Sequence, residues 1–523
     1  MNTSIPSTSS GASISTSMAT AEAGFLFDNT YAQELEGLYA PWHATPVKQP
    51  ALVKLNTALA VELGLNTDFL ESSAGVAVLS GNEVPPGASP LAQAYAGHQF
   101  GGYSPQLGDG RALLIGEIVD QRAKRRDIAL KGSGRTPFSR RGDGKAALGP
   151  VLREYLISES MHALGIPTTR ALAAVTTGEA VQRETMLPGA VLTRVASSHI
   201  RVGTFQFFAN RDDNTVLRRL ADYTINRHYP HLQSDADPYL GLLREVSEAQ
   251  ASLVAQWMLV GFIHGVMNTD NVTVSGETID YGPCAFMDRY DPATVYSSID
   301  QYGRYAYINQ PPIAQWNLGR FAEALLPLID SDSEKSVELA LEVVNAYPDR
   351  YQHYWLQGMR RKLGLTVEAA EDLTLAQGFL TAMEGQAVDY TQAFRQLSDL
   401  VDPSGSSDIA GASDNGAGGL RQLYSNPEAL NRWLESWRAR IASEPVEPAQ
   451  RAALMRSVNP VYIPRNHRVE EALTAATELH DFQPFEKLLM VLQQPFETQP
   501  AFETYAGPAP AEQSKTYQTF CGT

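Results

Sequence analysis

In the first part of the chain, apolar residues gather in short runs bounded by Gly, Pro and charged residues. Runs of this length and composition are typical of buried strands. They predict strands over 112–118, 127–131, 170–175, 179–183 and 190–195. A strand-rich unit is therefore expected in this part of the protein.

Other segments show the helical spacing of apolar residues. One helix is predicted over 52–63 and another over 150–164, where Pro150 suits the first turn. Further along the chain helices dominate, and they are predicted at 216–229, 239–260, 313–328 and 336–363. Strands followed by helices predict an α+β protein.

Two segments lack any such periodicity. Residues 1–24 are rich in Ser, Thr and Ala, and residues 401–419 are mostly Gly, Ser, Ala and Asp. Compositions of this kind predict a disordered N-terminus and a flexible insertion. We therefore expect an N-terminal lobe, a helical C-terminal lobe, and a helical C-terminal extension with a tail, which cover residues 25–205, 206–400 and 420–523.

Composition limits the class of protein. Among 523 residues, 41 are Lys or Arg and 58 are Asp or Glu, so the net charge is −17 and general binding to nucleic acid is disfavoured. No apolar run is long enough to span a membrane, and the first basic residue is Lys48, so no secretory or mitochondrial leader is visible. Two cysteines argue against a disulfide scaffold. A monomeric, cytoplasmic protein is expected.

The N-terminal lobe contains residues that suit a bound nucleotide. The sequence Gly108-Asp109-Gly110-Arg111 precedes a strand, so backbone amides and Arg111 can approach phosphate, although plain turns share this sequence. Lys131 ends a strand similar to the V-A-I-K strand of kinases. Glu154 on the next helix is placed to form the ion pair that kinases make with this lysine, or else is a solvated charge.

Positive charge concentrates between residues 122 and 145. This segment holds nine Lys or Arg and only two acids, Asp127 and Asp143. It is either a solvated basic loop or a site for a triphosphate or a departing pyrophosphate. Arg194 lies in the last predicted strand and Arg201 just after it, where the lobes should meet, although an arginine taken alone more often forms a surface salt bridge.

A catalytic-loop pattern in the C-terminal lobe carries the strongest signal. His264, Asn271 and Asp280 match the His and Asn of the kinase loop H-R-D-x-x-x-x-N and the Asp of D-F-G. Val266 replaces the catalytic Asp and cannot accept a proton, while a second carboxylate, Asp270, directly precedes Asn271. A lone His is more often structural than catalytic. The metal-binding residues of a kinase are thus present without its usual base, which indicates a pseudokinase or a different nucleotide chemistry.

Five stretches together resemble the selenoprotein O family, also called the YdiU-like protein adenylyltransferases. They are 95–101 (YAGHQFG), 106–111 (QLGDGR), 131–136 (KGSGRT), 264–271 (HGVMNTDN) and 280–283 (DYGP). The similarity continues into the C-terminal tail. The Ser/Thr-rich start and the 401–419 insertion look particular to this chain.

The resemblance implies a protein-kinase-like bilobal fold that binds ATP in a flipped orientation and transfers AMP, rather than phosphate, to Ser, Thr or Tyr hydroxyls of protein substrates. It implies Asp270 as the proton acceptor, with Asn271 and Asp280 as ligands of Mg²⁺ or Mn²⁺. The residues that it places against ATP are Gly108, Gly110, Arg111, Lys131, Asp143, Gly144, Arg194, Arg201 and Asp280. A flipped nucleotide agrees with Val266, because the α-phosphorus would then face Asp270.

Some members of this family carry a selenocysteine near the C-terminus. The corresponding residue here is Cys521, so this chain resembles a cysteine form. Cys284 follows Asp280 by four residues, in what would be the activation loop. We hypothesise a reversible disulfide between Cys284 and Cys521 that controls access to the site, with two unrelated reduced thiols as the alternative.

Two other functions remain open at this point. One is a true protein kinase that uses Asp270 as a displaced base, against which Val266 argues. The other is an inactive scaffold that only binds ATP or protein partners. A scaffold has no need of the complete set of Lys131, Asp270, Asn271 and Asp280.

Overall fold

The strands form one antiparallel sheet in the N-terminal part of the protein. The computed structural model describes residues 24–211, 214–401 and 418–520, so the predicted disordered start and the 401–419 insertion lie almost entirely outside the described residues. Along the sheet the order is β1-β3-β6-β7-β10-β9-β2, and β8 pairs with β10. The strands are β1 (Tyr39–Pro41), β2 (Ala51–Leu55), β3 (Leu91–Gln93), β6 (Ala112–Val119), β7 (Arg125–Lys131), β8 (Ala146–Ala147), β9 (Arg170–Gln182) and β10 (Met186–Ala196).

The strand predictions at 112–118, 127–131 and 190–195 are confirmed as β6, β7 and β10. The prediction of two strands over 170–183 was wrong, because β9 runs through without a break. It pairs with β10 along most of its length and with β2 up to Thr176, and this pairing carries the strand past Gly178 despite its positive φ of 68°.

The prediction of a helix over 52–63 is confirmed only for its second half. Residues Ala51–Leu55 form β2 on the edge of the sheet, where they pair with β9. The helix α3 (Thr57–Glu62) begins after Asn56, whose side chain accepts a hydrogen bond from the backbone N–H of Leu59. Asn is a favoured N-cap, so the capping residue sets the start of this helix rather than the apolar spacing.

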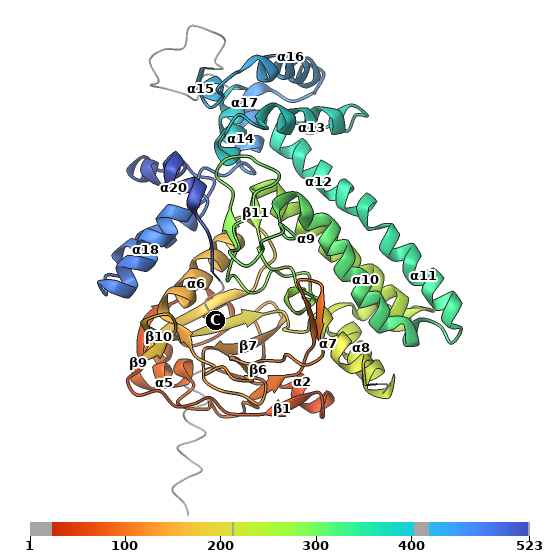
Figure 1. Ribbon diagram of the computed structural model, residues 1–523, viewed down its shortest axis with the longest axis vertical. Helices are drawn as coiled ribbons and strands as arrows, with labels where there is room; N and C mark the ends of the chain where they lie inside the picture. Colours follow the sequence, from red (N-terminus) through yellow and green to blue (C-terminus); the bar gives the residue numbers. More distant parts are fainter. Residues whose placement is uncertain (1–23, 212–213, 402–417, 521–523) are drawn as a thin grey trace, which may run out of the picture.

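The helix α6 (Leu148–Ala163) is the central element that joins the sheet to the rest of the molecule. It packs on β9 and β10 on one side and on α18 (Asn466–Glu478) and α19 (Gln483–Leu492) on the other. Nearly all of its residues are buried, including charged ones. Figure 1 shows α6 between the sheet below and α18 beside it.

The remainder of the chain is mostly helical. The predicted helix over 336–363 is divided at Ala346, because Pro348 lies in the first turn of the second helix and cannot donate a backbone hydrogen bond. No helix in the described part of the chain is long and apolar enough to cross a membrane. The principal helices of this part are α7 (Val202–Ala209), α8 (Asn214–His228), α9 (Pro238–Val260), α10 (Gln310–Ile329), α11 (Ser333–Asn345), α12 (Tyr347–Leu363), α13 (Asp372–Met383), α14 (Tyr390–Asp399), α15 (Gly418–Gln422), α16 (Glu428–Ala442), α17 (Pro448–Arg456) and α20 (Ala511–Thr516).

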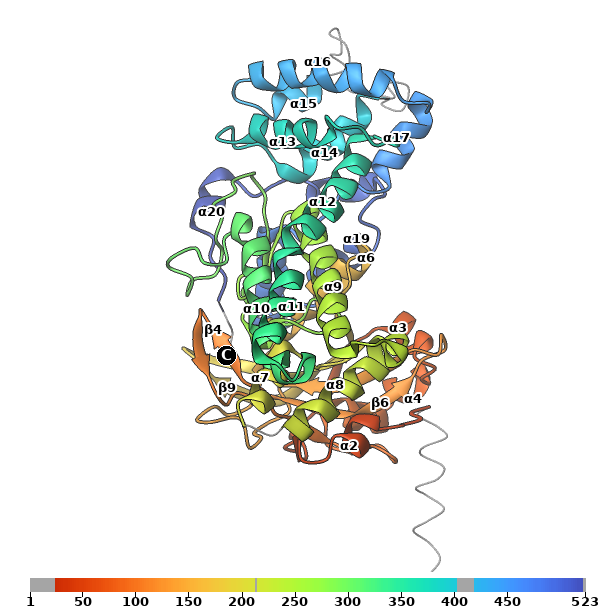
Figure 2. The ribbon, with the colours of Figure 1, turned by 90° about the vertical axis from the view of Figure 1, so that its right-hand side faces the viewer.

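These helices stack away from the sheet in two tiers. Figures 1 and 2 show α9 to α12 next to the sheet and α13 to α17 at the far end, after which the chain returns through α18 and α19 to lie against α6. Two short hairpins lie outside the main sheet: β4 (Gly97–Gln99) with β5 (Gly102–Ser104), and β11 (Phe262–Ile263) with β12 (Ala285–Phe286).

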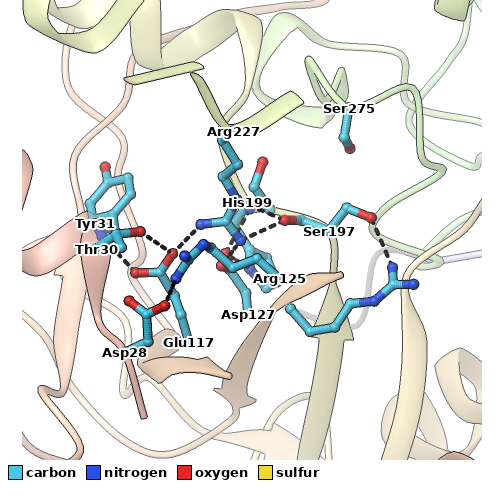
Figure 3. A network of polar contacts seen from close by, with 12 residues as sticks. Asp28, Thr30, Tyr31, Glu117, Arg125, Asp127, Ser197, His199, Arg227 and Ser275 are labelled. Atoms are coloured by element: carbon cyan, nitrogen blue, oxygen red, sulfur yellow. Dashed lines mark hydrogen bonds and ion pairs between the residues drawn. The ribbon is translucent and has the colours of Figure 1, made fainter. Parts of the chain in front are cut away.

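A buried polar cluster joins the sheet to α8 (Figure 3). The guanidinium of Arg227 forms ion pairs with Glu117 on β6 and with Asp127 on β7, the latter at 2.6 Å. Asp127 also accepts from Nδ1 of His199 at 2.9 Å, and Glu117 accepts from the backbone N–H of Tyr31. Burial alone would raise the pKa of Asp127, but Arg227 and His199 outweigh it and lower the pKa to about 2.

Candidate active site

A cavity of about 810 Å³ opens where loops of the sheet meet the loops that follow α9. Cavities of this size typically hold nucleotide-sized ligands. The sequence-predicted residues that line it are Gly108, Gly110, Arg111, Lys131, Asp143, Gly144, Asp270, Asn271 and Asp280. Segments far apart in the sequence are thus brought to one place by the fold.

Four charged side chains form a compact cluster at this cavity. Nζ of Lys131 lies 2.6 Å from Glu154 and 2.7 Å from Oδ1 of Asp280, so the ion pair expected between Lys131 and Glu154 is present. Arg194 on β10 contacts the same two carboxylates, at 2.5 Å and 2.6 Å. Helix α6 supplies Glu154, β7 supplies Lys131, and the loop after residue 279 supplies Asp280.

The cluster holds both carboxylates in the charged form. Burial would raise the pKa of Asp280, but the charges of Lys131, Arg194 and Arg201 outweigh it and keep the pKa well below its usual range. Burial likewise opposes the ionisation of Glu154, and Arg194 and Lys131 lower its pKa in the same way. Two cations therefore share two carboxylates at the wall of the cavity.

Arg194 and Arg201 lie beneath the cavity rather than on its surface. Both are 2% exposed. Arg201 precedes α7, stacks over the ring of Tyr95 at 4.3 Å, and has its Nη1 3.7 Å from Asp109. Nε and Nη1 of Arg201 are buried and have no hydrogen-bond partner among the described residues. A buried guanidinium with unsatisfied donors is costly unless an acceptor binds there.

Glycines form the turns next to these charges. Gly144 has a φ of 70°, and a Cβ on it would come within 2.1 Å of the carbonyl oxygen of Gly134. Gly108 has a φ of 82°, and a Cβ there would overlap the ring of Phe138. Both positions need glycine for conformation and for space. Asp143, beside Gly144, pairs with Arg183 at 2.9 Å.

Asp270 lies in the short 3-10 helix Thr269–Asn271 and is 9% exposed. Its Oδ1 is buried without a hydrogen-bond partner in the described structure, and a Cβ on Gly97 would come within 2.2 Å of that oxygen. Burial raises the pKa of Asp270 to about 6, despite the opposing charge of Arg201. A carboxylate with a raised pKa in the lining of a cavity has the properties of a general base.

Asn271 and Asp280, the predicted metal ligands, line the same cavity as Asp270. The Nδ2 of Asn271 donates to the carbonyl of Val266 at 3.0 Å, which leaves its Oδ1 as an acceptor. The hydrogen bonds that Lys131 and Arg194 donate to Asp280 both go to Oδ1, so among the described residues its second oxygen is left to accept another partner. In the described ranges no group of three or more His, Cys, Asp or Glu is placed to hold a metal. Mg²⁺ needs only one or two protein ligands when phosphates complete its shell, so the pair fits.

The backbone at this loop is held in an unusual conformation. Asp280 has a φ of 64°, which non-glycine residues rarely adopt and which costs roughly 1–3 kcal/mol. His264 is 1% exposed, and its Nε2 lies 2.9 Å from the carbonyl of Ile279, the residue before Asp280. His264 therefore has a structural role, since it connects the catalytic loop to the loop of Asp280.

The basic segment 122–145 is divided by the fold. Lys131, Arg140, Arg141 and Lys145 line the cavity. The Arg residues at the start of the segment lie away from it: Arg125 pairs with Asp28 at the other end of β7, and Arg122 and Arg126 border a different cavity. Only the part of the segment from Lys131 onward reaches the cavity.

Cys284 is buried and its thiol is free. Burial raises the pKa of Cys284 to about 11. Cys521 lies outside the described residues, so the disulfide hypothesis stays a prediction. The preceding part of the tail does reach this region, because Oγ1 of Thr519 donates to the carbonyl of Pro283 at 2.6 Å.

Several residues at the cavity carry no signal in the sequence. Phe138 and Arg183 come from loops and strands with no recognisable motif, and Ile299 lies in an irregular segment. Tyr95 and Gln99 belong to the stretch 95–101, which marks the family without indicating a role. Only the fold brings these side chains to the glycine turns at the cavity.

A carboxylate with a raised pKa, several cationic side chains and two further oxygen-bearing side chains thus lie around one cavity. Residues 24–493 match the sequence model of a family described as "Protein adenylyltransferase SelO". Two relatives described as "Protein nucleotidyltransferase YdiU" are similar over almost their whole length. The protein from Rhizobium etli is 58% identical over 501 residues, which cover 96% of this chain and 98% of the relative. The protein from Cereibacter sphaeroides KD131 is 59% identical over 500 residues, which cover 95% of this chain and 100% of the relative.

The chain belongs to the protein adenylyltransferase SelO family. It is accordingly an enzyme of the nucleotidyltransferase class.

Proposed function

We propose that this enzyme transfers AMP from ATP to Ser, Thr or Tyr hydroxyls of protein substrates. The observation that carries the proposal is the replacement of the kinase base by Val266 while Asp270, with its raised pKa, lies at the same cavity. The family described above supports nucleotidyl transfer. A γ-phosphoryl transfer in the usual kinase geometry would lack its base.

In this proposal the protein has a kinase-like arrangement of two lobes, with the ATP flipped relative to kinases. The N-terminal lobe of residues 25–205 and the helical lobe of residues 206–400 enclose the nucleotide, and residues 420–523 support them from outside. The β- and γ-phosphates lie toward Lys131, Arg194 and Arg201. The unsatisfied donors of Arg201 support this assignment, since a phosphate oxygen would satisfy them.

The chemistry then follows from the remaining groups. The hydroxyl oxygen of the acceptor attacks the α-phosphorus, the bond to the oxygen bridging to the β-phosphate breaks, and pyrophosphate leaves. Asp270 accepts the hydroxyl proton, and Lys131 and Arg194 stabilise the charge that develops on the leaving group. Asn271 and Asp280 would hold Mg²⁺ or Mn²⁺, which supplies Lewis-acid stabilisation of the phosphate oxygens when bound.

One experiment separates this proposal from its competitors. The purified protein is incubated with Mg²⁺, a mixture of soluble proteins, and ATP labelled on either the α- or the γ-phosphate. Label transferred from the α-phosphate supports AMP transfer, label from the γ-phosphate indicates a kinase, and transfer of neither indicates a scaffold. We expect α-label only, and we expect the reaction in the cytoplasm, by a monomer.

The matched controls use two Asp→Asn substitutions. Asp270→Asn removes the proton acceptor without changing its shape and should abolish labelling. Asp349→Asn changes an exposed carboxylate on α12 and should leave labelling unchanged. Equal labelling by Asp270→Asn and the parent would refute Asp270 as the base.

A further inference from the structure

Large apolar side chains are exposed at the mouth of the candidate active site. Phe100 and Ile299 both line the cavity and are 37% and 53% exposed. Tyr302, three residues after Ile299, is 97% exposed. Exposed apolar side chains that gather beside a functional cavity mark interaction surfaces more often than isolated ones do.

These apolar residues stand on a rigid base. The hairpin β4–β5 is attached to the catalytic loop, because the backbone N–H of Phe100 donates to Oδ1 of Asn268 at 3.1 Å. The hydroxyl of Tyr305 donates to the same oxygen at 2.7 Å, and its ring packs on that of Phe100 at 5.1 Å between centroids. Both parts of the mouth are thus anchored on Asn268, two residues before Asp270.

The hairpin is anchored at a second point. The backbone N–H of His98 donates to Oγ1 of Thr269 at 2.7 Å, and Nε2 of Gln206 lies 2.9 Å from Nδ1 of His98. In Figures 1 and 2 the β4–β5 hairpin lies beneath the loops that precede α10. Hydrogen bonds to the catalytic loop hold both parts of the mouth in place. A partner would therefore meet a preformed surface.

Positively charged side chains outnumber carboxylates in the cavity lining, six to three. Arg140 and Arg141 line the cavity and are exposed, and neither forms an ion pair with any described residue. The guanidinium of Arg304 lies over the ring of Trp316 at 4.8 Å, next to the turn at Gly101. On a protein with a net charge of −17, a local positive patch selects and steers acidic partners to this place.

We propose that Phe100, Ile299, Tyr302, Arg140 and Arg141 form the docking surface for the acceptor protein, and that this surface selects a hydroxyl flanked by an apolar residue and by acidic residues. The inference rests on the proposed function, because an acceptor hydroxyl must reach Asp270 and its flanking chain must then cross the mouth. An acidic and apolar segment is the partner that complements these five side chains.

A role in nucleotide binding is the principal competitor for these residues. Arg140 and Arg141 could contact phosphate, and Phe100 could pack on a base. Tyr302 separates the two explanations, since it is not part of the cavity lining and is almost fully exposed. The competitor predicts a weaker apparent affinity for ATP, whereas acceptor docking predicts a weaker apparent affinity for the acceptor alone.

The test uses full-length protein, α-labelled ATP with Mg²⁺, and a synthetic peptide library in which one Ser, Thr or Tyr is flanked by randomised positions. We expect the parent to prefer acidic and apolar flanks. Ile299→Ser and Tyr302→Ser should raise the KM for the preferred peptide by about tenfold, as for loss of an interface anchor, with the KM for ATP unchanged. Arg141→Glu should shift the preference from acidic toward basic flanks.

Two control variants lie outside the cavity lining. Leu479→Ser changes an apolar side chain that is 74% exposed after α18, and Arg432→Glu reverses an exposed charge on α16. Both should leave the peptide preference and both KM values unchanged. A rise in the KM for ATP in Ile299→Ser or Arg141→Glu, or an unchanged peptide preference in Arg141→Glu, would overturn the docking surface.

A second measurement keeps the inference separate from the proposed function. Fluorescence anisotropy reports binding of a labelled acidic, apolar peptide to the enzyme with a non-hydrolysable ATP analogue. If the α-label is never transferred by the parent, the proposed function fails, and the anisotropy alone decides on the surface. Binding that is lost in Arg141→Glu and retained in Arg432→Glu supports it, and binding equal in both variants contradicts it.

Discussion

Two clusters of buried charges lie on the same strand, four residues apart. Asp127 on β7 belongs to the cluster of Arg227, and Lys131 on β7 belongs to the cluster at the cavity. Arg227 and Arg201 are almost equally buried, with side chains 3% and 2% exposed. The two arginines nevertheless differ in how many of their guanidinium donors have partners within the chain.

The difference is in how many donors already have partners. All three nitrogens of the Arg227 guanidinium donate to groups within the chain: Glu117, Asp127 and the carbonyl of Ser197. Arg201 keeps two nitrogens without a hydrogen-bond partner among the described residues. A guanidinium whose donors all have partners stabilises the fold. A guanidinium with unsatisfied donors beside a cavity can instead bind a ligand. Each prediction below tests this contrast.

Asp280→Ala should have the largest effect. It removes a predicted metal ligand and a partner of both Lys131 and Arg194. Lewis-acid stabilisation by a bound ion supplies several kcal/mol, so transfer of α-label should fall by about 10³-fold or more. Circular dichroism and thermal melting should show a folded protein. Undiminished transfer would contradict the metal assignment.

Lys131→Met should lower turnover by about 10²–10³-fold, the usual cost of losing one group that stabilises a developing anion. Arg194 continues to pair with Glu154 and Asp280, so the fold should persist. Single-turnover kinetics with α-labelled ATP measures the change. A nucleotide-bound crystal structure is the second readout, and a γ-phosphate directed at Asp270 would refute the flipped orientation.

Arg227→Met should instead destabilise the protein. It leaves Glu117 and Asp127 buried without their cation, which typically costs about 3–5 kcal/mol. Urea unfolding measures the loss, and the activity per folded molecule should match that of the parent. The conservative variant Arg227→Lys should recover part of the stability. Lost activity at unchanged stability would place this cluster in the catalytic machinery.

Asp270→Asn should inactivate the enzyme and stabilise the metal-free protein. Burial raises the pKa of Asp270 from 3.8 to about 6, so ionising it in the folded state costs up to about 3 kcal/mol at about 1.4 kcal/mol per pKa unit. Because the folded pKa is raised, this cost is absent below pH 3.8 and complete above pH 6. The stabilising effect of Asn in urea unfolding should therefore grow as pH rises from 4 to 7. A pH-independent difference would count against the raised pKa.

The smallest effect is expected from the cysteines. If oxidised glutathione joins Cys284 and Cys521, activity should fall a few-fold, and Cys521→Ser should prevent the fall. Peptide mapping without reductant identifies the bond. The raised pKa of Cys284 disfavours the thiolate, so oxidation should be slow at pH 7. Equal responses of Cys521→Ser and the parent to oxidant would end the hypothesis.

The contrast between the clusters also shows what sequence can and cannot provide. Lys131, Glu154, Asn271 and Asp280 were predictable, because the order of kinase motifs is preserved even where the base is lost. The partners of Arg227 come from β6, β7 and α8 without any characteristic spacing, so only the tertiary fold reveals them.

Errors in the predicted elements have local physical causes. The apolar spacing over 52–63 continues through two elements, and the cap at Asn56 divides them. The helix over 336–363 is divided at Ala346 in a comparable way, before the Pro348 turn. In β9, strand pairing overrides the turn that Gly178 suggests. Capping and pairing partners decide these boundaries, and neither is evident from periodicity alone.

The position of Arg153, next to Glu154 on α6, has a consequence for biosynthesis. Its guanidinium contacts Glu470 at 3.1 Å, the hydroxyl of Tyr517 at 3.3 Å and the carbonyl of Cys284 at 2.6 Å. A ribosome makes Glu154 more than three hundred residues before it makes Glu470 and Tyr517. The growing chain therefore carries Lys131 and Glu154 long before the contacts of Arg153 with the C-terminal part of the protein can form. The support of α6 is thus completed late in translation.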